Sequence, residues 1–111
     1  MNAIEIRPRE NLNADVMIPG SKSCTARGLL MAGVTKGESV LREAADCDDT
    51  DRMIDGLETL GVNIRRDGTT IYIESEGLKR PSKPLKLGNS GTAIRFLTAA
   101  CASVKGKTIL D

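Results

Sequence analysis

The feature that most limits the fold of this chain is a pattern that occurs twice. Each copy has a glycine-rich polar loop, a helix-like apolar segment, a Lys-Gly pair and a short strand, and the copies begin PGSKSCTARGLLMAG and KLGNSGTAIRFLTAA. Ser23, Thr25, Ala26 and Ala32 align with Ser90, Thr92, Ala93 and Ala99. After a two-residue insertion, Gly37, Val40 and Leu41 align with Gly106, Ile109 and Leu110. The shared order predicts an internal repeat, whose units bury their apolar faces against one another.

Periodicity predicts the elements of one unit. The apolar side chains of residues 23–34 predict a largely buried helix that Ser21 or Ser23 can cap. A short strand over residues 39–41 follows. The segment DCDDTDRMIDGLETLG then predicts a second helix, because carboxylates fill its first turn, an apolar stripe follows, and Gly61 is a natural C-terminal stop. We interpret these acidic residues as a charged helix start, from which Asp48 or Asp49 can reach a cleft.

A β-hairpin is the firmest strand prediction. Asp67-Gly68 lies between the alternating apolar residues of 62–64 and 71–73, as in a two-residue turn. The basic stretch KRPSKPLK, residues 79–86, contains two prolines and predicts a solvated surface loop.

The two ends of the chain carry weaker signals. Short strands are predicted at residues 3–7 and 15–18, and the second copy predicts a helix over 92–104 and a strand at 108–111. The second copy lacks the acidic helix and hairpin of the first, so the chain is expected to be the front of a longer protein. The apolar residues near the N-terminus would then lack partners, and we expect residues 1–13 to be poorly ordered or to pair with another copy.

Composition excludes several classes of function. The 111 residues carry a net charge of +1 and contain only one Tyr and one Phe, which disfavours a nucleic-acid partner. The absence of His excludes His-based nucleophile pairs and His-containing metal sites. Three cysteines without CxxC spacing predict small buried side chains in a reduced, cytoplasmic setting. No apolar leader or membrane-spanning stretch is seen in the sequence.

The first loop has the residues of an anion site. A helix start offers unpaired N–H groups and the positive end of the helix dipole, and glycine allows close approach to the backbone. Lys22 adds a point charge, Ser21 and Ser23 add hydroxyl donors, and Arg27 adds a planar fork one turn after Ser23. The loop is not a Walker A motif, because serine rather than glycine precedes Lys22. A polar helix cap with a solvated lysine is the alternative interpretation.

The second loop has the same character. Asn89, Ser90, Gly91 and Thr92 offer amide, hydroxyl and backbone donors, and Arg95 follows. A glycine-permitted turn with a Ser or Thr cap is again the alternative. Two such loops on adjacent repeats can hold two anions, or two anionic groups of one reaction.

Three segments together resemble a known family. PGSKSCTARGLLMAG, DCDDTDRMIDGLETLGV and LGNSGTAIRFLTAA, in this order, are similar to the N-terminal part of the 5-enolpyruvylshikimate-3-phosphate synthase family. The resemblance runs from about Ile6 to Asp111. It implies transfer of the carboxyvinyl group of phosphoenolpyruvate to the 5-hydroxyl of shikimate 3-phosphate, with release of phosphate and no cofactor.

The resemblance also implies roles for the loop residues. Lys22 would touch both substrates, and Ser23 and Arg27 would bind shikimate 3-phosphate. Gly91 would line the phosphoenolpyruvate pocket, which is also the glyphosate site of the family, with Asn89 and Thr92 beside it, and Arg95 is a possible further ligand. The acid and base groups of the family would lie outside this chain, which is therefore expected to be inactive alone. Ala26, Phe96 and Cys24 depart from the usual residues of the family motifs.

The implied fold is an α/β architecture, the inside-out α/β barrel of enolpyruvyl transferases, with repeated β-α-β-α-β-β units whose helices lie inside and sheets outside. Residues 1–20 would belong to the other domain of the full enzyme. Residues 21–111 would form the first repeat and the start of the second, about one and a half units, and the remainder of the synthase would complete the site.

Three alternatives remain. A UDP-N-acetylglucosamine enolpyruvyl transferase shares the fold but typically has Lys-Asn where this chain has Lys22-Ser23. The others are a non-catalytic anion-binding module, and a structural fragment that is inert until a complementary piece binds.

Overall fold

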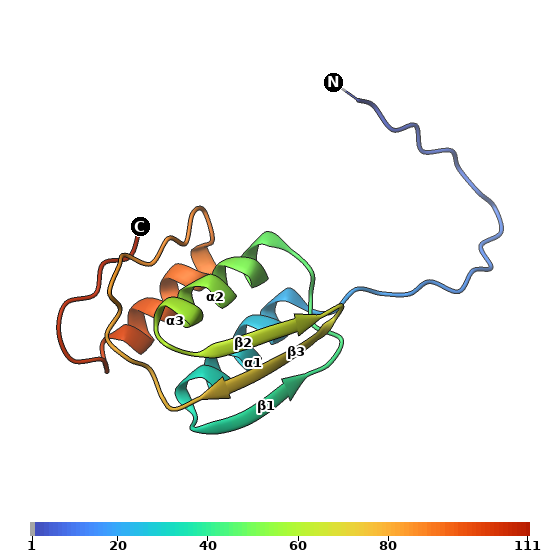
Figure 1. The fold of residues 1–111 in the computed structure, drawn as a ribbon. Coiled ribbons are helices and arrows are strands. Elements are labelled where there is room, and N and C mark those ends of the chain that lie inside the picture. Colours follow the sequence, from blue (N-terminus) through green and yellow to red (C-terminus); the bar gives the residue numbers. More distant parts are fainter. Residues whose placement is uncertain (1) are drawn as a thin grey trace.

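Three helices and a three-stranded antiparallel sheet form the body of the chain, and an extended N-terminal segment leads away from it (Figure 1). The computed structural model describes residues 2–111. The elements, in chain order, are α1 (Lys22–Val34), β1 (Gly37–Leu41), α2 (Asp48–Thr59), β2 (Asn63–Asp67), β3 (Thr70–Ser75) and α3 (Gly91–Cys101). The predicted helix, strand, helix and hairpin of the first unit are all confirmed.

The hairpin strand β3 is the centre of the sheet. Its neighbours are β1 and β2, in the order β1-β3-β2, and both run antiparallel to it. The hairpin turn lies one residue later than predicted, because Asp67 pairs with Thr70 and leaves Gly68 and Thr69 as the turn. Gly68 has a φ of 59°, a left-handed conformation that glycine adopts without steric cost.

The core lies between one face of the sheet and the helices. Side chains at alternate positions of β3, Ile71 and Ile73, point into it and are almost fully buried. The helices supply the rest of the apolar side chains, among them Met53, Leu57 and Leu97, each with no exposed area. α1 and α2 therefore pack on this face of the sheet, and α3 packs on α1 and α2.

The opposite face of the sheet is open. Val40 and Tyr72 are partly exposed there, and the Arg65 guanidinium stacks on the Tyr72 ring with 4.1 Å between its central carbon and the ring centroid. Helices on one side and an open face on the other agree with a unit whose sheet lies outside.

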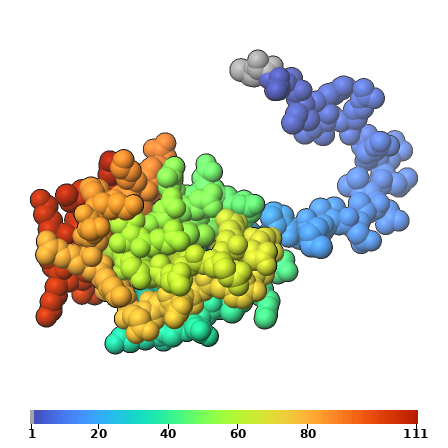
Figure 2. All heavy atoms as spheres, viewed as in Figure 1, coloured from blue at the N-terminus to red at the C-terminus, as the bar shows by residue number. Residues whose placement is uncertain are grey.

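The predicted N-terminal strands at 3–7 and 15–18 are wrong. Residues 2–20 form no strand, and Ile4 and Ile6 are 89% and 90% exposed. Figure 2 shows the segment projecting from the body, and Met1 lies outside the described residues. Alternating apolar residues form a stable strand only beside a partner, and no described segment pairs with these.

The second copy of the pattern is shorter than predicted. α3 ends at Cys101 rather than at residue 104, and residues 102–104 continue as turns. The predicted strand at 108–111 is reduced to a parallel bridge between Leu85 and Leu110. This bridge draws Leu85 into the core, so the predicted surface loop over 79–86 is exposed only in part.

The cysteines differ in environment. All three are free thiols; Cys101 is buried, Cys47 is intermediate and Cys24 is exposed. The prediction of small buried side chains is therefore wrong for Cys24, because it lies on the outward side of the first turn of α1. In residues 2–111 no helix is long and apolar enough to cross a membrane.

When the two copies are aligned by backbone geometry, one constant shift relates them, whereas alignment by residue identity needs an insertion. Ser21 and Ser90 cap α1 and α3 in the same way, each accepting a hydrogen bond from the backbone N–H three residues on. The same spacing relates Gly37 to Gly106, both of which have a positive φ. No insertion is needed in this register.

We predict that Leu97→Ala lowers the free energy of unfolding by about 2–5 kcal/mol, because it removes a fully buried side chain and leaves a cavity between α2 and α3. Ile94→Ala, on the same helix but 38% exposed, is the matched control and is expected to cost clearly less. Urea denaturation of both variants measures the difference, and equal losses would contradict the packing described.

Candidate anion-binding site

Two capped helix starts form the walls of the site. The Ser21 Oγ accepts a hydrogen bond of 3.2 Å from the Cys24 N–H, and the Ser90 Oγ accepts one of 3.2 Å from the Ala93 N–H. These bonds satisfy part of each helix N-terminus, and the residues that directly follow each cap face the space between them.

That space is an open pocket of about 530 Å³. Its lining comprises Lys22, Ser23, Arg27, Asp49, Asn89, Gly91, Thr92, Arg95 and Phe96. All of these except Asp49 and Phe96 were predicted from the two loops. Ser21 and Ser90, which were also predicted to be hydroxyl donors to the anion, are not in the lining, because their hydroxyls cap α1 and α3.

The cations of the pocket come from two helices, Lys22 and Arg27 from α1 and Arg95 from α3. The Lys22 Nζ lies 2.7 Å from the Asp49 Oδ2, which ties the start of α1 to the first turn of α2. The Arg27 Nη1 donates a 3.2 Å hydrogen bond to the Ser23 carbonyl and lies near the Phe96 ring, with 5.9 Å from the guanidinium carbon to the centroid. Most of the donor capacity of Arg27 is free for a ligand.

The Lys22–Asp49 pair shifts the titration of both groups. The hydrogen bond from Lys22, and the Ser90 hydroxyl beside the carboxylate, hold the pKa of Asp49 below its ordinary value of 3.8. The same carboxylate raises the pKa of Lys22 above 10.5. Both groups are therefore charged at neutral pH, and the pocket contains a preformed ion pair.

The four aspartates near the start of α2 have different roles. Asp49 reaches the pocket, with its side chain 23% exposed, whereas Asp46 and Asp51 pair with Arg66 outside it. The expectation that Asp48 or Asp49 can reach a cleft is confirmed for Asp49, and the interpretation of a charged helix start accounts for the others. No local signal distinguishes Asp49, because its role follows from the packing of α2 beside α1.

Gly91 leaves part of the pocket wall open. A Cβ built on it would meet no atom within 4 Å. The glycine is thus not required by packing within this chain, and a side chain there would occupy space that the pocket offers to a ligand.

The lining of the pocket is suited to binding an anion. Its ionisable lining consists of Lys22, Arg27 and Arg95 and the carboxylate of Asp49, which the ion pair keeps ionised. Within residues 2–111 no group of three or more His, Cys, Asp or Glu is placed to hold a metal ion. The arrangement suits a ligand with at least one multiply charged anionic group.

A family sequence model matches nearly the whole chain. The model is described as EPSP synthase (3-phosphoshikimate 1-carboxyvinyltransferase) and matches residues 6–111. The chain belongs to the EPSP synthase family.

Curated EPSP synthases of two rhizobia are similar to this chain. The 3-phosphoshikimate 1-carboxyvinyltransferase of Rhizobium leguminosarum bv. trifolii (strain WSM2304) is 49% identical over 108 residues, which is 96% of this chain and 26% of the relative. That of Rhizobium etli (strain ATCC 51251) is 50% identical over 108 residues, again 96% of this chain and 26% of the relative. The chain therefore spans about a quarter of the length of these relatives.

The fold agrees with the family. The solved EPSP synthase from Acinetobacter baumannii superposes with a TM-score of 0.80 over 86% of this chain and 23% of that structure, at 24% identity. The α/β unit described above is thus the fold of one part of an EPSP synthase.

We predict that Lys22→Met raises the pKa of Asp49, because it removes the largest cause of its lowering. The lowered pKa of Asp49 stabilises the fold above pH 3.8, and this contribution is lost as the pH falls through the folded-state value. The raised pKa of Lys22 contributes below pH 10.5 and is lost as the pH rises through its folded-state value.

Carbon-detected NMR of the aspartate carboxyls measures the titration, and denaturation at a series of acid pH values measures the stability. The variant is expected to lose stability less steeply in acid than the parent. Lys36→Met removes an equal charge beyond the far end of α1 and is the control. An unchanged Asp49 titration in Lys22→Met would contradict the ion pair.

Proposed function

We propose that this chain supplies part of the substrate cleft of an EPSP synthase, which transfers the carboxyvinyl group of phosphoenolpyruvate to the 5-hydroxyl of shikimate 3-phosphate and releases phosphate. The observation that carries the proposal is the convergence of two helix starts and three cationic side chains on one pocket. Both proposed substrates are anions, which such a pocket attracts.

Shikimate 3-phosphate is assigned to the α1 side of the pocket. Arg27 presents a planar fork that matches two oxygens of one phosphate, and Ser23 adds a hydroxyl one turn earlier. Lys22 lies between this side and Asp49, where its ammonium group can also reach a second anion. We therefore propose that Lys22 contacts both substrates.

Phosphoenolpyruvate is assigned to the α3 side. Asn89 and Thr92 offer polar side chains there, Gly91 leaves room for the ligand, and Arg95 adds a positive charge. The dipole of α3 favours an anion at this end.

The reaction needs groups that this pocket does not supply. Protonation of the enol carbon and removal of the hydroxyl proton require an acid and a base, and the carboxylate of Asp49 is held ionised by Lys22. We propose that these groups come from the remaining length of the synthase, so that the chain alone binds weakly and does not turn over.

The same reasoning extends to the organisation of the complete enzyme. We propose that residues 1–20 belong to its other domain, which would give the exposed Ile4 and Ile6 their partners. Residues 21–111 would be one repeat and the start of the next. A cytoplasmic location is proposed as well, in keeping with three free thiols.

The function is testable in a chimaera that carries this chain in place of the corresponding quarter of the Rhizobium leguminosarum enzyme. We expect phosphate release that depends on both substrates. Arg27→Ala is expected to raise the KM for shikimate 3-phosphate about ten- to a hundredfold, because charge-assisted hydrogen bonds contribute about 1.5–3 kcal/mol. Lys22→Ala is expected to raise the KM for both substrates.

Arg65→Ala is the control, because it removes an arginine from the open face of the sheet. A folded chimaera that releases no phosphate would contradict the function. Unchanged constants in both Lys22→Ala and Arg27→Ala would contradict the site.

Gly91→Ala tests the assignment of the second loop. Since a Cβ there meets no protein atom, we expect an unchanged melting temperature. We also expect weaker phosphoenolpyruvate binding, by about 1–3 kcal/mol, because the methyl group occupies ligand space. The KM for each substrate in the chimaera separates the two sides, and a rise confined to shikimate 3-phosphate would reverse the assignment.

A further inference from the structure

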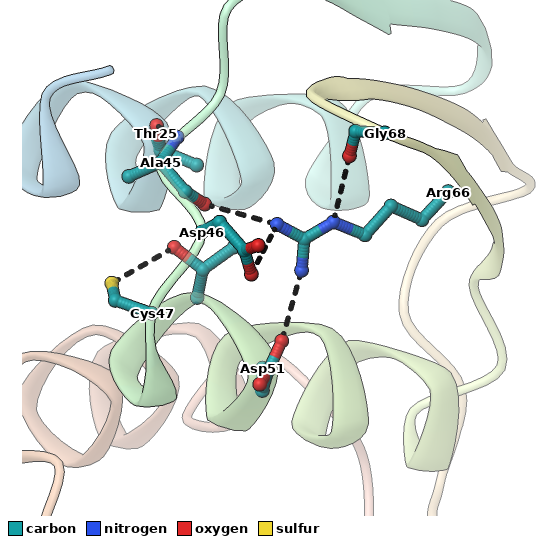
Figure 3. A network of polar contacts seen from close by, with 8 residues as sticks. Thr25, Ala45, Asp46, Cys47, Asp51, Arg66 and Gly68 are labelled. Atoms are coloured by element: carbon teal, nitrogen blue, oxygen red, sulfur yellow. Dashed lines mark hydrogen bonds and ion pairs between the residues drawn. The ribbon is translucent and has the colours of Figure 1, made fainter. Parts of the chain in front are cut away.

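The side chain of Arg66 joins three parts of the fold outside the pocket (Figure 3). Its Nη1 donates to the Asp51 Oδ1 at 3.0 Å, and its Nη2 to the Asp46 Oδ1 at 3.0 Å and to the Ala45 carbonyl at 3.3 Å. Its Nε donates to the Gly68 carbonyl at 3.2 Å. One guanidinium thus connects the hairpin turn, the segment before α2 and the first turn of α2.

A second set of bonds continues from Ala45 to the start of α1. The Ala45 N–H donates a buried hydrogen bond of 2.9 Å to the Thr25 Oγ1, and the same hydroxyl donates to the Ser21 carbonyl at 2.8 Å. Thr25 is only 6% exposed, so water competes little for these bonds. Ser21 directly precedes Lys22, and we call this set of bonds the threonine relay.

Arg66 is therefore linked through other residues to both Lys22 and Asp49, although it contacts neither. Asp51 lies in the same helical turn as Asp49, and the threonine relay ends at the residue before Lys22. We propose that Arg66 is a positioning residue of the anion site, which holds the first turn of α2 against the start of α1 so that Lys22 and Asp49 meet in the pocket. Its role in ligand binding rests on the proposed function; its role in the ion pair does not.

The hydrogen bonds made by the side chain of residue 66 require an arginine. The side chains of β2 alternate between faces, so Arg65 stacks on Tyr72 on the open face whereas Arg66 points to the helices. The Arg66 side chain is 24% exposed and uses all three of its nitrogens. A lysine keeps the charge but cannot reproduce this planar set of donors.

Loss of Arg66 should change the relative position of the starts of α1 and α2 more than it lowers the free energy of unfolding. Its two carboxylate partners are exposed, Asp46 by 83% and Asp51 by 56%, so they stay solvated when the arginine is removed. The consequence expected is a looser contact between the two helix starts, not an unfolded chain. Loss of a group that orients metal ligands lowers affinity about ten- to a hundredfold, and we expect an effect at the lower end of that range here.

The experiment compares Arg66→Met, Arg66→Lys and Arg65→Met in the 111-residue chain. Without ligand, NMR follows the carboxyl titration of Asp49 and the amide shifts of residues 21–24. With shikimate 3-phosphate added, the same spectra give a Kd. We expect both Arg66 variants to raise the pKa of Asp49 toward its ordinary value, to move the amide shifts and to weaken binding about tenfold. Arg65→Met should leave all three readouts as in the parent.

The lysine variant separates geometry from charge. If Arg66→Lys behaves as the parent, or if Arg65→Met produces the same changes as Arg66→Met, the positioning role is overturned. Ligand-free changes in a chain whose parent does not bind shikimate 3-phosphate would uphold the positioning role. The binding comparison is then made in the chimaera, where a folded parent that does not bind shikimate 3-phosphate would count against the proposed function.

The threonine relay gives a second test that does not depend on the stability of the Arg66 variants. Thr25→Val removes the hydroxyl and keeps the shape, whereas Thr25→Ser keeps the hydroxyl. We expect Thr25→Val to raise the pKa of Asp49 and Thr25→Ser to restore it. If both variants titrate as the parent does, α1 is held by other contacts and the proposal is overturned.

Discussion

The close packing of α2 between α1 and α3 is the constraint on which the site depends. A Cβ on Gly33 of α1 would overlap the Leu57 side chain of α2, and a Cβ on Gly56 of α2 would overlap the Leu97 side chain of α3. Each leucine thus fills the space that a missing side chain leaves on the neighbouring helix. Because the helices lie this close, the start of α2 approaches that of α1, and the loop before α3 reaches the same place. The pocket follows from helix packing and not from the loops themselves.

Much of this was predictable because the signals are local. Helical and alternating periods identify the elements of the first unit, since each period reports which face is buried. The residues of the two loops, Lys22, Arg27 and Gly91 among them, were identifiable because the chemistry of a helix N-terminus is set within a few residues. Two loops of the same kind also implied that they act together, and in the structure both line one pocket.

The features that were not predicted depend on contacts between residues that are distant in sequence. In the sequence, Asp49 has the features of an ordinary carboxylate in the first turn of a helix. It becomes the partner of Lys22 only because α2 packs against α1. The apolar alternation near Ile4 predicts a strand, but a strand needs a neighbour to pair with. Residue identity aligns Ser23 with Ser90, whereas backbone hydrogen bonds make Ser21 the equivalent of Ser90, because the capping hydroxyl is defined by the bond it accepts.

The negative charge of Asp49 opposes anion binding less strongly than its place in the pocket suggests. A lysine side chain loses rotamer entropy when it is fixed, and the contact with Asp49 imposes part of that cost before a ligand arrives. An ammonium group has three donors, and the carboxylate uses one. Two remain, so the ammonium group of Lys22 can donate to two further anionic groups at once. In this view Asp49 orients the lysine, and Arg27 and Arg95 supply the positive charge that Asp49 offsets.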